Sequence, residues 1–153
     1  MAARELDVVS WEDLDALVDE LAGMVGDDYD VMMAISRGGL VPAGMLAYRL
    51  GLRHVLVASA VAYHDGSQTG GPPVLLEFPE PVRLEGRRIL LVDEVWESGR
   101  TIAAVVDLVL AAGGLPTTAV LHYKPSRSLV PIVPDHHVVS TDAWVNYPFK
   151  AGR

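Results

Sequence analysis

ILLVDEVWESGRT, residues 89–101, joins a short apolar run to a polar segment with the composition of a helix start. Four apolar residues in a row, bounded by polar ones, are typical of a buried strand. The run ends in two adjacent acids, Asp93 and Glu94, and a third acid, Glu97, follows four residues after Asp93. Ser98 to Thr101 then precede an apolar stretch with helical spacing. The segment therefore predicts a strand, a polar turn and a helix over 98–112.

The polar turn predicts a phosphate-binding cup. Gly99 allows close approach of the backbone to a ligand, and a helix N-terminus offers unpaired N–H groups and the positive end of the helix dipole. Ser98 and Thr101 add hydroxyl donors. Asp93 and Glu94 would repel a phosphate, so they need hydroxyl groups or a cation as partners. A phosphorylated sugar that carries a magnesium ion meets both requirements.

Strand and helix patterns alternate on both sides of this segment. We expect strands at 30–36, 55–61, 88–94, 117–123 and 137–140, and helices between Ser10 and Gly26 and at 40–50. Ser10 and Asp13 have the spacing of a capping box, and Leu14, Leu17, Leu21 and Met24 recur at helical spacing. This order predicts an α/β fold, a parallel twisted sheet flanked by helices, with ligands beyond the carboxyl ends of the strands. The Gly- and Pro-rich residues 63–87 are expected to form a small hood insertion over the site.

Length and charge narrow the function. The 153 residues suit one domain, 1–153, and the net charge of −8 disfavours nucleic-acid binding, which needs a basic face. An anionic ligand must then be held locally, by a few arginines, backbone amides or a metal ion. No apolar run is long enough to cross a bilayer, no secretory signal is visible and there is no cysteine. We therefore expect a cytoplasmic protein without a membrane partner.

A second loop motif follows the first predicted strand. Ser36-Arg37-Gly38-Gly39 combines an arginine, which makes bidentate phosphate contacts, with two glycines whose backbone amides can face an anion. A Gly-Gly turn beside a surface arginine would explain the same residues without a ligand. The two loop motifs together favour the anion site.

The 89–101 segment resembles the PRPP-binding signature of type I phosphoribosyltransferases, and residues 34–42 resemble the pyrophosphate loop of the same family. The resemblance implies that Glu97 is the catalytic acid/base and that Glu94 lies closest to a Mg²⁺ cofactor. It implies PRPP binding by Asp93, Glu94, Ser98, Gly99, Arg100 and Thr101, and pyrophosphate binding by Ser36, Arg37, Gly38 and Gly39.

The last third of the chain is similar to the small xanthine–guanine and hypoxanthine phosphoribosyltransferases. The similarity rests on Lys124-Pro125, on 134–139 and on DAWV (142–145) followed by Tyr147-Pro148. It implies that Lys124 donates to the purine 6-oxo group, that Trp144 stacks on the base and that the backbone of Val145 reads the position-2 edge. A core or interface position is the alternative for Trp144.

The resemblance implies transfer of 5-phosphoribose from PRPP to guanine, xanthine or hypoxanthine, a reaction of purine salvage. Three residues depart from the family pattern: Glu97 stands where Asp is usual, Trp96 where a small aliphatic is usual, and Ala62-Tyr63 where the hood usually has Ser-Tyr. A phosphoribosyltransferase for another acceptor, or a non-catalytic PRPP-sensing regulator, are therefore alternatives. We also expect a homo-oligomer, a dimer or a tetramer.

Overall fold

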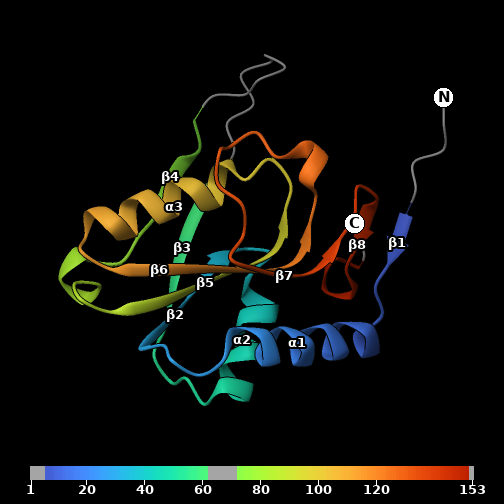
Figure 1. Cartoon of the computed structure of the whole chain (residues 1–153), viewed down its shortest axis with the longest axis horizontal. Coiled ribbons are helices and arrows are strands. Elements are labelled where there is room, and N and C mark those ends of the chain that lie inside the picture. Colours follow the sequence, from blue (N-terminus) through green and yellow to red (C-terminus); the bar gives the residue numbers. More distant parts are fainter. Residues whose placement is uncertain (1–5, 62–71, 152–153) are drawn as a thin grey trace.

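The computed structural model describes residues 6–61 and 72–151 and contains a six-stranded sheet with helices on both faces (Figure 1). The strand order is β4-β3-β2-β5-β6-β7. The strands of this sheet are β2 (Val31–Ser36), β3 (Val55–Val61), β4 (Val74–Glu77), β5 (Arg88–Trp96), β6 (Leu115–Tyr123) and β7 (His136–Ser140). The helices are α1 (Trp11–Val25), α2 (Leu40–Leu50) and α3 (Arg100–Ala111).

The predicted α/β class with a parallel sheet is confirmed for five neighbouring strands, β3, β2, β5, β6 and β7, which pair in parallel. The edge strand β4 pairs antiparallel with β3, so the complete sheet is mixed. This strand belongs to the predicted hood insertion, and the hood residues 62–71 lie outside the described residues. Within the described residues, no helix combines the length and apolar character needed to cross a membrane.

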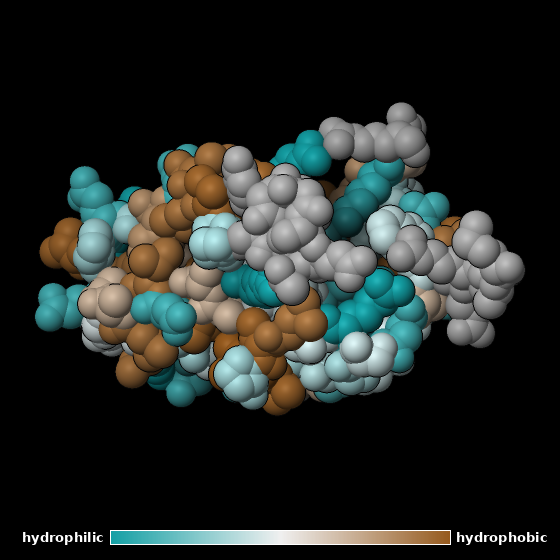
Figure 2. Space-filling view, turned by 90° about the horizontal axis from the view of Figure 1, so that it is seen from above, coloured by the Kyte–Doolittle hydropathy of each residue, from teal (hydrophilic) through white to brown (hydrophobic). Residues whose placement is uncertain are grey.

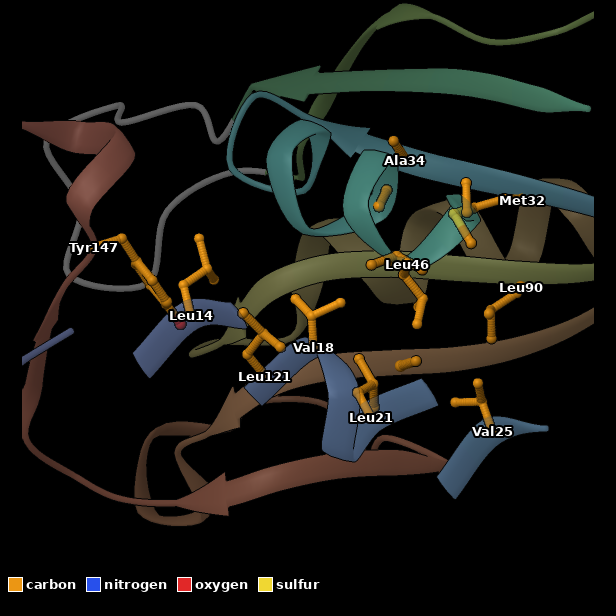
Figure 3. Close-up of a cluster of buried hydrophobic side chains, with 14 of the residues drawn as sticks. Leu14, Val18, Leu21, Val25, Met32, Ala34, Leu46, Leu90, Leu121 and Tyr147 are labelled. Carbon is orange, nitrogen blue, oxygen red and sulfur yellow. The ribbon is translucent and has the colours of Figure 1, made fainter. Parts of the chain in front are cut away.

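Both faces of the central strands are buried, which explains their continuous apolar sequence. Met32 and Ala34 of β2 face α1 and α2, whereas Met33 and Ile35 belong to the cluster under α3. From α1 the buried stripe is Leu14, Val18, Leu21 and Val25, which Figure 3 shows packed against the sheet. Of the predicted stripe, Leu14 and Leu21 are buried and Leu17 packs partly buried against the same core, whereas the prediction was wrong at Met24, which is exposed.

The helix over 98–112 begins later than predicted, at Arg100, because Gly99 has a left-handed backbone and ends the turn that precedes the helix. The capping box of Ser10 and Asp13 is present as predicted. Strand β6 begins two residues earlier than predicted and includes Pro116, which is possible because β7 pairs with β6 only from Ala119 onward. The sequence pattern missed one further parallel pair, β1 (Leu6–Val8) with β8 (Trp144–Asn146).

The topology creates a crevice between the central strands β2 and β5. From β2 the chain passes through α2 to β3 on one side, and from β5 it passes through α3 to β6 on the other side. The loops after β2 and β5 therefore diverge to opposite faces of the sheet. In open α/β sheets such a switch point, at the carboxyl ends of the strands, is the usual ligand site.

Candidate active site

The loop after β2 lies directly against the end of β5. A side chain on Gly39 would place its Cβ 2.4 Å from the Val92 carbonyl oxygen, so the close packing of this loop on β5 requires glycine. At Gly38 a Cβ would lie 2.0 Å from the Glu94 carboxyl carbon. The two glycines therefore bring the Ser36–Gly39 backbone next to the carboxylate of Glu94.

A cleft of about 610 Å³ opens in front of this contact. Its walls include Arg37 and Gly38 from the loop after β2, Glu94 from β5, and Trp144 and Val145 from β8. Arg37 is exposed, while the side chain of Val145 belongs to the hydrophobic core. Three groups of predicted site residues, far apart in the sequence, therefore border one cleft.

A second hollow of about 150 Å³ lies at the start of α3. It is lined in part by Asp93, Glu97, Ser98, Gly99 and Thr101. Gly99 has φ +77°, and a Cβ there would lie 2.2 Å from the Trp96 indole nitrogen. The backbone conformation and this contact both require glycine, so the predicted cup is a narrow turn formed over a buried tryptophan.

Trp96, the unusual spacer in the motif, anchors the cup from beneath. It is 1% exposed, and its indole N–H donates to Ser128 Oγ at 3.1 Å. The Leu129 N–H donates to the Ser98 carbonyl at 2.9 Å. Trp96 thus fills the space below the cup and ties it to the segment that follows Lys124.

The pKa values of the two adjacent acids are shifted in opposite directions. Burial of its carboxyl group and the adjacent Glu94 charge raise the pKa of Asp93 well above its ordinary value. Although burial opposes ionisation of Glu94, its pKa is lowered, because Asp93 and the Lys150 ammonium hydrogen-bond to it. Lys150 Nζ lies 2.7 Å from Glu94 Oε1. The two shifts therefore favour ionisation of Glu94 over ionisation of Asp93.

Lys124 connects the two hollows. This lysine is 3% exposed, its Nζ lies 3.6 Å from Glu97 Oε1, and it lies 5.4 Å from the centre of the Trp144 ring. Arg127 approaches the same Glu97 oxygen at 3.5 Å. A buried ammonium, an aromatic face and a carboxylate are therefore adjacent. This arrangement suits a planar, hydrogen-bonding ligand.

Sequence reasoning missed the hydrogen-bond chain that holds the C-terminal wall in place. The Tyr147 hydroxyl donates to the Glu94 carbonyl at 2.8 Å and lies 2.6 Å from His122 Nδ1. Because the Tyr147 hydroxyl proton is donated to the Glu94 carbonyl, the His122 Nδ1–H must donate to the Tyr147 oxygen. The sequence signal that could have revealed this chain is His122, a polar residue at a buried position of β6. The chain ties β8 and its neighbours to β5 and β6.

This network predicts a pH dependence of stability. Burial lowers the pKa of His122 from 6.5 to about 4. Between these values the unfolded chain binds a proton that the folded chain excludes, so the free energy of unfolding should fall as the pH drops from 6.5 toward 4. Denaturant titrations at about pH 7 and about pH 5 measure the change. His122→Gln should show a smaller pH difference, and an equal difference in both proteins would contradict the assignment.

The comparisons with known proteins agree with the fold. The family model described as phosphoribosyl transferase domain matches residues 10–151. Among solved structures, the chain is similar to a purine phosphoribosyltransferase from Pyrococcus horikoshii, with 28% identity and a TM-score of 0.80 over 95% of this chain and 93% of that one. It is similar to a hypothetical protein from Neisseria gonorrhoeae with bound ppGpp, with 26% identity and a TM-score of 0.85 over 99% of this chain and 93% of that one. The fold is shared with the xanthine-guanine-hypoxanthine phosphoribosyltransferase of Helicobacter pylori, with 20% identity and a TM-score of 0.81 over 95% and 94% of the two chains.

Proposed function

The chain belongs to the phosphoribosyl transferase domain family, and on this premise we propose that it transfers 5-phosphoribose from PRPP to a 6-oxopurine base. The products would be a nucleoside 5'-monophosphate and pyrophosphate, as in purine salvage. One observation carries the choice of base: the buried ammonium of Lys124 lies 5.4 Å from the Trp144 ring centre and 3.6 Å from Glu97. An ammonium donates only, so it pairs with a 6-oxo oxygen and opposes a 6-amino group.

The proposed roles follow from the positions of the residues. The cup at Ser98, Gly99, Arg100 and Thr101 would hold the 5-phosphate through backbone N–H groups at the start of α3. The Ser36–Gly39 loop, with Arg37, would hold the pyrophosphate on the other side of β5. Asp93 and Glu94, between the two loops, would bind the ribose hydroxyls. This order matches a sugar that carries a phosphate at one end and a diphosphate at the other.

Glu97 would face N7 of the purine and hold its proton while the bond between the ribose carbon and pyrophosphate breaks and the bond to N9 forms. Trp144 would stack on the base, and the Val145 backbone would contact its position-2 edge. With the base beside Glu97 and the ribose beside Asp93, the reacting atoms would meet at the end of β5.

The residues fit a magnesium ion that arrives with the substrate. Within residues 6–61 and 72–151, no group of three or more His, Asp or Glu side chains could hold a metal. Magnesium is often bound by one or two carboxylates and completed by substrate phosphates and water. Glu94, whose carboxylate occupies the space that a Cβ on Gly38 would fill, and Asp93 are suitable ligands. When bound, the ion would neutralise charge on the pyrophosphate.

A product assay tests the proposal. The protein is incubated with PRPP, magnesium and each base in turn, and nucleoside monophosphate and pyrophosphate are quantified. We expect equal amounts of both products with guanine, xanthine or hypoxanthine. Product with only a non-purine acceptor would select the alternative of another acceptor. Binding of PRPP without product on any base would select a non-catalytic sensor.

Magnesium dependence is a separate prediction. Because Glu94 is charged and a PRPP diphosphate would approach it, removal of the metal should weaken PRPP binding by about tenfold, a difference of roughly 1.4 kcal/mol. Calorimetry with magnesium and with EDTA measures both affinities. Equal affinities in the two conditions would remove the metal from the proposed site.

One of the similar solved structures gives a reason to test a second ligand, ppGpp, with this chain. The Neisseria gonorrhoeae protein was solved with bound ppGpp, a guanine nucleotide that carries two diphosphates. The two anion loops and the stacking position of Trp144 offer this chain the matching groups. If ppGpp occupies the proposed PRPP site, it should compete with PRPP in calorimetry. A regulator rather than an enzyme would bind ppGpp and form no product.

A further inference from the structure

We propose that Lys150 is an internal counter-ion for Glu94 and that it transfers to the substrate's diphosphate when a metal ion binds the acid pair. The inference rests on the proposed function, because it assigns a residue to the proposed PRPP site. Lys150 ends the short helical turn Pro148–Lys150, which follows β8. Its Nζ lies 2.7 Å from Glu94 Oε1, where it neutralises a carboxylate that is 8% exposed.

The burial of Glu94 explains why a cation, the Lys150 ammonium, lies beside it. A carboxylate removed from water requires a partner of opposite charge. The protein carries a net charge of −8 and has only two lysines, of which Lys124 is buried beside Glu97. Lys150 is therefore the lysine that serves Glu94, and its ammonium also lies 5.3 Å from the centre of the Tyr147 ring.

The same contact must change when a divalent cation binds. A metal ion at Glu94 would place two positive groups on one carboxylate, which is unfavourable. The Lys150 side chain is 44% exposed and is carried by a flexible four-carbon stem, so it can leave Glu94 without unfolding the chain.

The cleft itself offers the new partner. Lys150 lines the same 610 Å³ cleft as Arg37 and Gly38, the residues proposed to hold the pyrophosphate. Among the described residues that line this cleft, Arg37 and Lys150 are the basic ones. An ammonium released from Glu94 would therefore be available, with Arg37, to an incoming diphosphate in this cleft.

The proposal requires opposite effects on two ligands. In Lys150→Gln, Mn²⁺ alone should bind about threefold to tenfold more tightly, because Glu94 is no longer ion-paired, whereas inorganic pyrophosphate added with saturating Mn²⁺ should bind more weakly by a similar factor. Lys150→Arg should keep both affinities close to those of the wild type. Arg53→Gln, which removes one charge from an exposed position before β3, is the matched control and should change neither affinity.

Both ligands are measured by calorimetry on the full chain, with thermal unfolding to verify that each variant folds. Weaker binding of both ligands would indicate a structural role and overturn the proposal. No change in either, a change in Mn²⁺ alone, or no pyrophosphate binding by the wild type would also overturn it. The opposite shifts in a protein that forms no product would support the role of Lys150 and refute the proposed transfer reaction.

Discussion

Replacing Glu97 with glutamine is expected to lower turnover by about two to four powers of ten, the usual contribution of general acid–base catalysis. Glutamine keeps the size of the side chain and a polar oxygen near Lys124 and Arg127, which lie 3.6 and 3.5 Å from Glu97 Oε1. It removes the ability to hold the proton of N7. Steady-state rates with saturating PRPP and hypoxanthine measure the effect.

The affinity for PRPP should change little in this variant, because the proposed cup at residues 98–101 would hold the 5-phosphate mainly through backbone N–H groups. Glu85→Gln, the same change at an exposed position before β5, is the control and should keep the wild-type rate. If Glu97→Gln turns over normally, Glu97 only anchors the two basic side chains. Glu97→Asp would then show whether the additional methylene matters.

Lys124 is expected to determine the preference for 6-oxopurines. The wild type should use hypoxanthine at least about tenfold better than adenine, since a buried donor facing a 6-amino donor costs roughly 1–3 kcal/mol. In Lys124→Ala, kcat/KM for hypoxanthine should fall by about 10- to 150-fold, because a hydrogen bond to a charged group contributes about 1.5–3 kcal/mol. Adenine should gain little, because alanine supplies no acceptor for its amino group.

Lys124→Met provides a second variant that keeps most of the buried aliphatic volume, since the side chain of Lys124 is 4% exposed. Both variants should lose the preference while the affinity for PRPP is kept. A wild type that prefers adenine, or variants that retain the full preference, would show that Lys124 does not contact the 6-position. In that case the ammonium only neutralises Glu97.

The family and the parallel core of the sheet were predictable from two short loops. The strand and turn at 89–101 and the Ser36–Gly39 loop contain local signals, apolar runs and obligatory glycines, which do not depend on distant contacts. The proximity of these two loops followed from one rule, that the carboxyl ends of parallel strands lie at the same edge of the sheet. The family prediction is confirmed by the match over residues 10–151, whereas the roles of the individual residues stay predictions.

Contacts between distant segments could not be predicted. Neither the pairing of β1 with β8 nor the ion pair between Lys150 and Glu94 leaves a periodic pattern, because each depends on where the C-terminal segment docks. The three-residue strands are too short to show alternation. The helical stripe on α1 differed at Met24 for a related reason: Met24 and Val25 are both apolar, and only the position of the sheet decides that Val25 is buried and Met24 exposed.

The pairing of β1 with β8 has a consequence for how the protein is made. Leu6 pairs with Trp144, and most of the chain lies between these two residues. Closing this contact therefore costs more loop entropy than closing the contact between any two neighbouring strands of the central sheet. On the ribosome, residues 36–39 and 93–101 emerge well before Trp144 and Lys150. A nascent chain can thus assemble the half with the two proposed phosphate loops before the half with the residues proposed to bind the purine exists. Recovery of catalysis during refolding should accordingly trail the recovery of the central sheet.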